Sequence, residues 1–304
     1  MPQQIIFFLF NNYLGEIAAL SAALLWAISS VIYGRLGLKI SPLKLNLYKG
    51  IIAIAFIALT LAIQGTAFTD ISGRTIALLS LSGVIGIGLG DTAYFSALNS
   101  LGARRTLLLE TASPPIGALL ALIFLGERLT PLTWCGILLT IIGIAWVISE
   151  RNPLNNKIVS RQGVIWGILA AIAQAVGSVI SRFALVQSDI TSLESALIRL
   201  LGGTAIIMVL LLLSAATKQS EAKMTLSARS LGIIAIAAWG STYLGIWLQQ
   251  TSLKFAPTGI AQTFLATSPL FVLPIVTLQG EKITWRSILG VGISLSGIAL
   301  MFIR

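Results

Sequence analysis

The sequence predicts an all-α polytopic membrane protein in which ten transmembrane helices form two inverted five-helix repeats. Three observations support this prediction. First, 56% of the residues are hydrophobic, 10% are charged and the mean hydropathy is +0.95, which is more apolar surface than a soluble domain can bury. Second, apolar stretches of about 19 residues recur along the chain. Third, the two halves of the sequence match each other.

The apolar stretches define ten spans, each long enough to cross a bilayer core of roughly 30 Å as a helix. Their hydrophobic period is helical rather than alternating, so a membrane-spanning barrel is excluded. The spans cover residues 15–36, 43–63, 75–98, 103–125, 131–149, 163–186, 191–214, 230–253, 256–279 and 284–303. The longest polar stretches, 150–162 and 217–229, are interpreted as loops.

The duplication is visible as two sequence matches. A shift of 148 residues places 15–32 (GEIAALSAALLWAISSVI) on 163–180 (GVIWGILAAIAQAVGSVI), with 8 of 18 positions identical, and a shift of 154 places Pro115 on Pro269. An odd number of spans in each repeat turns the second copy upside down, as in many alternating-access transporters. We therefore divide the chain into a lead-in (1–14), a first repeat (15–149), a connecting loop (150–162) and a second repeat (163–304).

Basic residues are distributed unevenly between the two sides of the predicted bundle. Of the 20 Lys and Arg residues, thirteen lie in or beside loops that follow odd-numbered spans, and five lie in the other loops and the termini. Positive loops stay in the cytoplasm, so both termini are predicted to lie outside a plasma (inner) membrane. The net charge of +10 thus reflects topology, and we expect no nucleic-acid partner.

The residues and motifs that the sequence lacks exclude several kinds of metal site, catalysis and energy source. The chain has one cysteine, Cys135, and no histidine, which excludes soft-metal sites and Ser-His or Cys-His catalysis. It has no GxxxxGK[ST] phosphate-binding loop, which argues against direct ATP drive. We therefore expect no catalytic residue, no metal and no cofactor.

Prolines occur at matching depths in spans 4 and 9. Because proline removes a backbone donor and clashes with the preceding turn, both helices are expected to kink or break at matching depth, with Pro114, Pro115, Pro269 and Pro274 as the candidates. Paired interruptions point to a site near the membrane midplane. Glu127, at the end of span 4, is expected to favour the N-terminus of the next helix rather than to bind solute.

Four ionisable residues fall inside predicted spans. At 1.5 Å of rise per residue, Lys49, Asp91 and Glu110 all lie about 9–10 Å from the predicted cytoplasmic face. Arg199 enters from the opposite face, where the inverted counterpart of Lys49 belongs. Two interpretations remain open: a structural ion-pair network, or a gate and ion-coupling site in which Glu110, and after it Asp91, exchanges protons.

Aromatic and amide side chains supply the candidates for solute binding. Trp26 lies near mid-membrane and aligns with Gln174 in the second repeat, so the two are expected to face each other across the cavity. The full set of cavity candidates is Trp26, Tyr94, Gln174, Trp239, Tyr243, Gln249 and Gln262.

The order of these features resembles that of the EamA family of the drug/metabolite transporter superfamily. The resemblance rests on ten spans, the five-plus-five duplication, a basic residue near the start of spans 2 and 7, and the paired segments SPPIGALLALIFLGERLT and TSPLFVLPIVTLQGEKIT. It implies a monomeric bundle whose cavity is lined by spans 1–4 and 6–9, with spans 5 and 10 behind. It also implies a secondary carrier, often an exporter of amino acids or other metabolites.

We therefore expect a secondary active transporter that exports a small organic metabolite, such as an amino acid or a related solute, by alternating access. Its expected partners are the solute and the lipid bilayer. Two alternatives stay open. An intramembrane lipid-modifying enzyme would use Asp91 and Glu110 as its acidic pair, and a passive channel would conduct solute without saturation.

Overall fold

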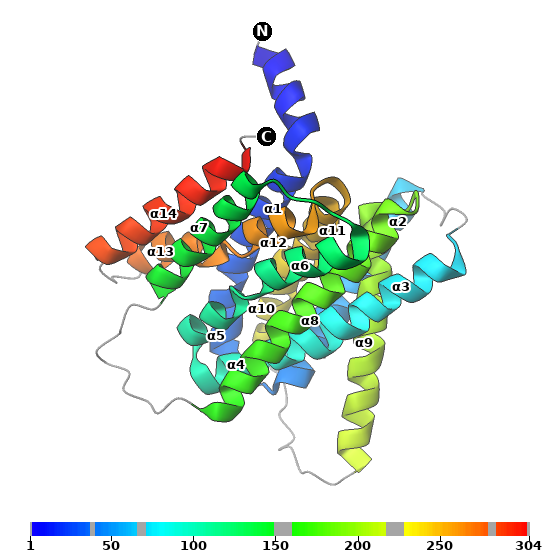
Figure 1. Cartoon of the computed structure of the whole chain (residues 1–304). Coiled ribbons are helices and arrows are strands. Elements are labelled where there is room, and N and C mark those ends of the chain that lie inside the picture. Colours follow the sequence, from blue (N-terminus) through cyan, green and yellow to red (C-terminus); the bar gives the residue numbers. More distant parts are fainter. Residues whose placement is uncertain are drawn as a thin grey trace.

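The computed structural model describes residues 2–36, 40–65, 71–148, 160–216, 228–278 and 284–302, and every regular element in these ranges is a helix (Figure 1). The elements are α1 (Pro2–Leu36), α2 (Pro42–Gln64), α3 (Gly73–Gly83), η1 (Val84–Gly90), α4 (Asp91–Leu101), α5 (Ala103–Glu110), α6 (Ser113–Leu125), α7 (Pro131–Ile148), α8 (Arg161–Val186), α9 (Ser192–Ala216), α10 (Ala228–Ala238), η2 (Trp239–Leu244), α11 (Gly245–Phe255), α12 (Thr258–Leu265), α13 (Ser268–Leu278) and α14 (Trp285–Phe302). For the described residues, the all-α prediction is confirmed.

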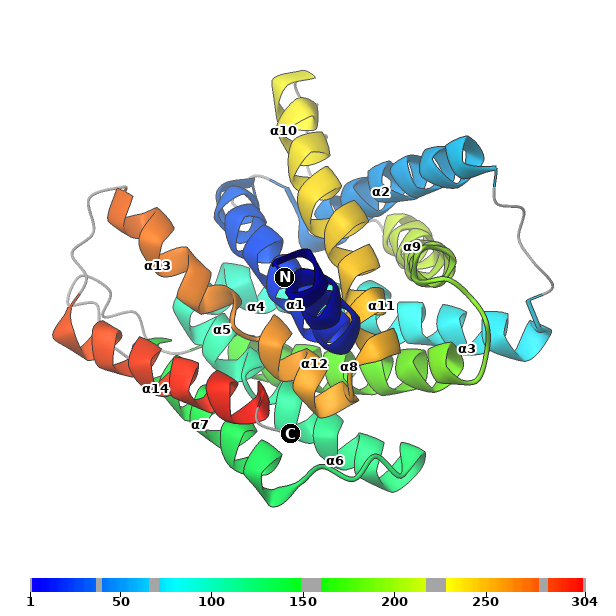
Figure 2. The same cartoon turned by 90° about the horizontal axis from the view of Figure 1, so that it is seen from above.

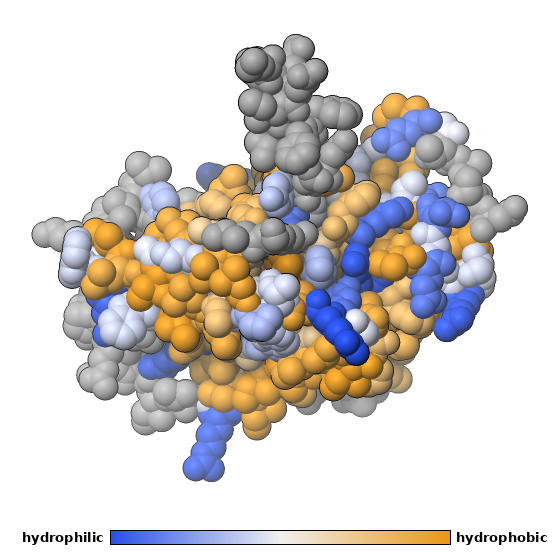
Figure 3. Space-filling view, turned by 45° about the horizontal axis from the view of Figure 1, so that its top comes forward, coloured by the Kyte–Doolittle hydropathy of each residue, from blue (hydrophilic) through white to orange (hydrophobic). Residues whose placement is uncertain are grey.

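Within the described residues, seven helical stretches are long and apolar enough to cross a membrane. They are Tyr13–Tyr33, Pro42–Gln64, Gly73–Leu101, Arg105–Leu125, Arg161–Val186, Ser192–Leu213 and Ala228–Phe255, and shorter apolar helices cover Pro131–Trp146 and Ile288–Phe302. Large hydrophobic side chains on the outside, such as Ile63 and Ile236, are more than 70% exposed, and hydrophobic residues cover much of the face drawn in Figure 3. The chain is therefore a multi-pass membrane protein; its ten spans and inverted repeats stay predictions.

Helix α1 changes direction near the predicted end of the lead-in. Its backbone leaves helical geometry at Tyr13, where φ is −125° and ψ is 24°. The first part of α1 projects beyond the bundle, and α1 begins on the same side on which α14 ends (Figure 1). We call this side the upper face and the side where α1 ends at Leu36 the lower face.

Two helices of the bundle contain π-helical turns that the apolar pattern does not reveal. η1 interrupts the helix formed by α3 and α4, and η2 interrupts the helix formed by α10 and α11. These are the third spans of the two predicted repeats, so the two π turns occupy equivalent places. π-helical turns are rare in proteins, and those that occur are often found at functional sites.

Glycines allow α9 to pack closely against the first of these interrupted helices. A Cβ atom at Gly83 would lie 1.9 Å from the carbonyl oxygen of Arg199, and one at Gly203 would lie 2.9 Å from the carbonyl oxygen of Gly83. In lipid, helices gain no hydrophobic free energy by associating, so close packing must hold them together. Small residues such as these glycines let the helix backbones approach each other. This contact brings Arg199 beside η1.

The fourth span of each predicted repeat is broken into two helices. The first break lies at Thr111 and Ala112, just before Pro114 and Pro115 in the first turn of α6. The second lies at residues 266–267, just before α13 begins with Ser268 and Pro269.

Proline at these first-turn positions removes an N–H that has no helical partner, so each helix restarts there readily. A break at Pro274 is not found: this proline lies inside α13, and the helix continues past it, because transmembrane helices tolerate a missing hydrogen bond where neighbours compensate.

Helices α7 and α14 pack along each other. A Cβ atom at Gly136 would lie 2.8 Å from the carbonyl oxygen of Gly297, and one at Gly297 would lie 2.5 Å from the backbone nitrogen of Thr140. Ser294 also donates to the carbonyl oxygen of Thr140. This small-residue contact joins the last helices of the two halves at the edge of the bundle (Figure 2).

Candidate functional site

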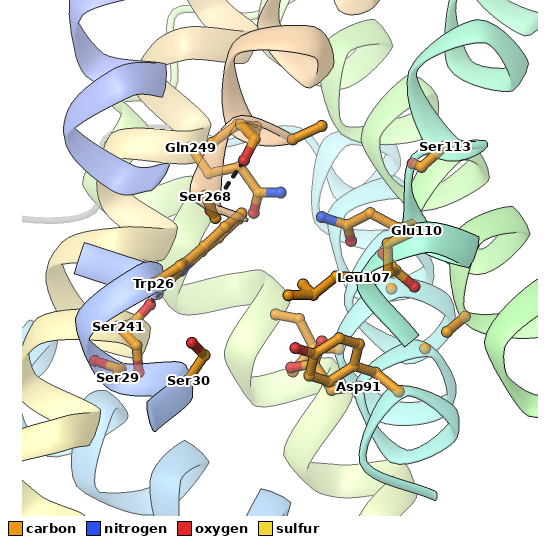
Figure 4. A pocket seen from close by; sticks show the side chains of 18 of the residues that line it. Trp26, Ser29, Ser30, Asp91, Leu107, Glu110, Ser113, Ser241, Gln249 and Ser268 are labelled. Atoms are coloured by element: carbon orange, nitrogen blue, oxygen red, sulfur yellow. Dashed lines mark hydrogen bonds between the residues drawn. The ribbon is translucent and has the colours of Figure 1, made fainter. Parts of the chain in front are cut away.

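A cavity of about 200 Å³ lies between the two halves of the chain. In Figure 4, Trp26, Ser29 and Ser30 of α1 and Ser241 of η2 form one wall, and Leu107, Glu110 and Ser113 form the opposite wall. Both π-helical turns and both broken helices contribute to the lining, whereas α7 and α14 contribute no residue to it. The irregular parts of the bundle therefore face the cavity, where non-helical backbone is tolerated in a membrane protein.

One end of the cavity carries three of the predicted ionisable residues. Lys49 of α2 forms an ion pair with Asp91, the first residue of α4, and its ammonium lies 5.2 Å from the ring centre of Phe95. Glu110, the last residue of α5, lines the same cavity, and its Oε1 atom is buried without a hydrogen-bond partner. The structure thus joins two of the three residues and leaves the third facing the cavity.

A second polar group contains Arg199, Gln249 and Gln262. Arg199 is 1% exposed and donates from Nη1 to Oε1 of Gln249 over 3.2 Å. Gln262 of α12 accepts a hydrogen bond from the Ser113 hydroxyl of α6 over 2.7 Å, which links the broken helices of the two halves. All of these residues line the cavity.

The aromatic candidates Trp26 and Tyr94 also line the cavity, as does Gln174 of α8. The indole N–H of Trp26 donates to the carbonyl oxygen of Ser241 over 2.8 Å, so η2 fixes the ring. Sequence reasoning missed Tyr33, whose hydroxyl lies 3.1 Å from the hydroxyl oxygen of Ser241. Tyr33 lies two helical turns after Trp26 on the same face of α1, and this spacing could have predicted that it also lines the cavity.

Two aromatic candidates lie outside this lining. Trp239 is 47% exposed and belongs to the outer surface. Tyr243 is buried between Phe56 and Trp247, and its hydroxyl lies 2.9 Å from that of Thr60. Both residues belong to η2, whose wider turn changes which residues face the cavity.

The structure also places Glu127 in a contact between the two halves. Its carboxylate accepts hydrogen bonds from Nε of Arg182 over 2.7 Å and from the backbone N–H of Thr258 over 2.8 Å. Arg182 donates in turn to the carbonyl oxygens of Leu253 and Lys254. We call these five residues the Glu127 cluster. Glu127 therefore supports the N-terminus of α12, not of the next helix as expected.

A buried amide–hydroxyl group lies near this cluster. The hydroxyls of Ser181 and Ser195 both donate to Oε1 of Gln250, and all three residues are fully buried.

Among the described residues, no group of three or more His, Cys, Asp or Glu side chains is placed to hold a metal ion. Cys135 is exposed on α7.

The helical bundle and its charged central cavity define a class of protein, the multi-pass membrane transporters. The model of the EamA-like transporter family matches residues 13–149 and again residues 161–303, and the chain belongs to this family. The two matched segments correspond to the two predicted repeats. The expected family resemblance is confirmed.

Individual relatives agree with this assignment. An uncharacterized transporter of Archaeoglobus fulgidus is 24% identical over 291 residues, which cover 94% of this chain and 96% of the relative. An uncharacterized transporter of a Sinorhizobium species is 32% identical over 123 residues, which cover 40% of this chain and 85% of the relative. A solved crystal structure with 16% identity superposes with a TM-score of 0.74, covers 94% of this chain and 95% of its own, and shows the same fold.

Proposed function

We propose that the chain is a secondary active transporter that moves a small organic metabolite, an amino acid or related solute, out of the cell by alternating access. The observation that supports this most directly is the cavity itself, which is lined from both halves by buried ionisable residues. Such residues are costly inside a membrane and mark solute or ion pathways. The cavity volume of about 200 Å³ suits a small solute.

We further propose that the two halves are inverted five-helix repeats that rock against each other. The paired π-helical turns and the paired helix breaks support this arrangement, since each pair occupies equivalent places in the two family matches. In inverted-repeat carriers, discontinuous helices surround a midplane site. The bundle is proposed to act as a monomer in the plasma membrane, with its upper face outside the cell.

For the driving force, we propose proton coupling at Glu110, with the Lys49–Asp91 pair as the neighbouring gate. The buried Oε1 atom of Glu110 has no partner, whereas Asp91 is already paired with Lys49. A carboxylate without a fixed cation can bind and release a proton as the cavity opens to either side.

The test is solute counterflow in liposomes that contain the purified protein. Metabolites that raise its melting temperature are loaded inside, and entry of the labelled solute is followed against its concentration outside. A carrier gives saturable entry that is accelerated by internal solute. Flux without saturation or acceleration would support the passive channel, and turnover of lipid without solute flux would support the intramembrane enzyme.

A further inference from the structure

Three buried hydrogen-bond donors in the cavity lining have no acceptor among the described residues. They are Nε of Arg199 and the amide nitrogens of Gln249 and Gln262. These side chains are 1%, 2% and 3% exposed, and all three line the cavity. Buried polar atoms are nearly always paired in folded proteins, so an unpaired group needs an explanation such as a missing ligand or water.

The orientation of both amides is set by the bonds they already make. Oε1 of Gln249 accepts from the Arg199 guanidinium, which can only donate, and Oε1 of Gln262 accepts from the Ser113 hydroxyl. The NH2 groups are therefore left over. Within the described residues Arg199 makes this one hydrogen bond and no ion pair, so Nε of its guanidinium and the amide nitrogen of Gln249 are left as unpaired donors.

The backbone around Arg199 keeps this charge beside the cavity. Gly86 of η1 faces the guanidinium, and a Cβ atom at Gly86 would lie 3.2 Å from Nη2 of Arg199 and 3.8 Å from Oε1 of Gln174. Glu110 presents an unpaired buried acceptor to the same cavity. Unpaired donors at Arg199 and Gln249 and an unpaired acceptor at Glu110 therefore line one cavity, and they match a solute with the reverse pattern.

We propose that Arg199 and Gln249, which are joined by a hydrogen bond, form a carboxylate-binding subsite of the transport cavity, and that a donor group of the same solute, such as an ammonium, faces Glu110. This assignment rests on the proposed function. A carboxylate has two acceptor oxygens in the plane that a guanidinium fork matches, and its single negative charge equals the charge of Arg199. A phosphate carries more charge than this subsite balances.

The subsite is tested first by ligand-induced thermal stabilisation of the purified full chain. The probes are the standard amino acids and inorganic phosphate, followed by the carboxamide and the decarboxylated amine of each stabilising amino acid. We expect stabilisation by an amino acid, apparent binding at least about tenfold weaker for its carboxamide and amine, and no response to phosphate. The subsite is refuted if the carboxamide binds as well as the acid, if phosphate alone stabilises the chain, or if no amino acid does.

Variants separate recognition from folding. Arg199→Gln is expected to abolish stabilisation by the acid, while the matched control Arg128→Gln, at an exposed position, keeps it. Because Arg199→Gln can also impair folding, Gln249→Glu provides a second test: its carboxylate would pair with Arg199 in place of the solute. This variant should melt at a higher temperature than wild type without ligand and should no longer respond to the acid. A Gln249→Glu variant that still binds the acid with wild-type affinity would overturn the subsite.

Flux distinguishes this inference from the proposed function. Saturable counterflow of a solute without a carboxylate would keep the carrier and refute the subsite. Carboxylate binding that depends on Arg199 without any counterflow would keep the subsite and refute the carrier.

Discussion

The Glu127 cluster offers the sharpest energetic prediction, for the substitution Glu127→Gln. The carboxylate makes two hydrogen bonds shorter than 2.9 Å, to Arg182 and Thr258, and the two charged side chains are only 14–15% exposed. Truncating one partner of a buried charge pair costs about 2–5 kcal/mol. Glutamine keeps the shape and the acceptor for Thr258 but loses the charge, so we expect a loss of about 2 kcal/mol in the free energy of unfolding.

The assay is reversible unfolding in mixed micelles with an increasing SDS fraction. The control is Arg128→Gln, one residue further along the same segment and exposed, for which we expect a change within about 0.5 kcal/mol. In a double-mutant cycle, Glu127→Gln and Arg182→Gln should be non-additive, because both remove the same contact. Additive effects, or a Glu127→Gln variant as stable as Arg128→Gln, would refute the energetic importance of this contact.

Three further predictions concern the cavity and its packing. Lys49→Met and Asp91→Asn should each abolish counterflow and lower the melting temperature, and the double variant should be more stable than either single variant because neither charge of the pair is left without its partner; thermal melting of all three checks this. Glu110→Gln should lose uptake driven by an imposed pH gradient and should show counterflow only at raised solute concentration, because it also loses the charge that faces the solute's donor group; a variant that keeps uptake driven by the pH gradient would exclude Glu110 from coupling. Gly83→Ala should destabilise the protein by about 1–3 kcal/mol or more, since its methyl group would overlap the backbone of α9, whereas Gly73→Ala, with no heavy atom within 4 Å of its new Cβ, should be neutral in the same melts.

Much of the fold follows from patterns that act within one helix. The apolar stretches predict the helices because span length is fixed by the bilayer thickness. Lys49 and Asp91 are predicted to lie at the same depth in the membrane, because the rise per residue is constant along a helix. The structure brings these two residues into contact. The repeat alignment likewise placed Trp26 and Gln174 in one cavity.

Patterns within one helix do not predict which face of a helix points into the cavity, nor which residues of the two halves of the chain contact each other. Trp239 is an aromatic residue in a span that was expected to line the cavity, but it is the first residue of the π turn η2 and lies on the outer surface. Glu127 has local features of a helix cap, and its partners Arg182 and Thr258 are 55 and 131 residues away. The serines around Gln250 give no sequence signal either, since small polar residues are common in transmembrane packing.

The central claim, alternating access to one cavity, is tested most directly by the accessibility of a single cysteine from both sides of the membrane. Ser30→Cys in a Cys135→Ser background places the thiol on the cavity wall (Figure 4). Oriented liposomes are treated with a membrane-impermeant maleimide from either side, with and without a transported solute. Alternating access predicts labelling from both sides, slowed by solute on each. Labelling from one side only under every condition, or rates that solute does not change, would contradict the account.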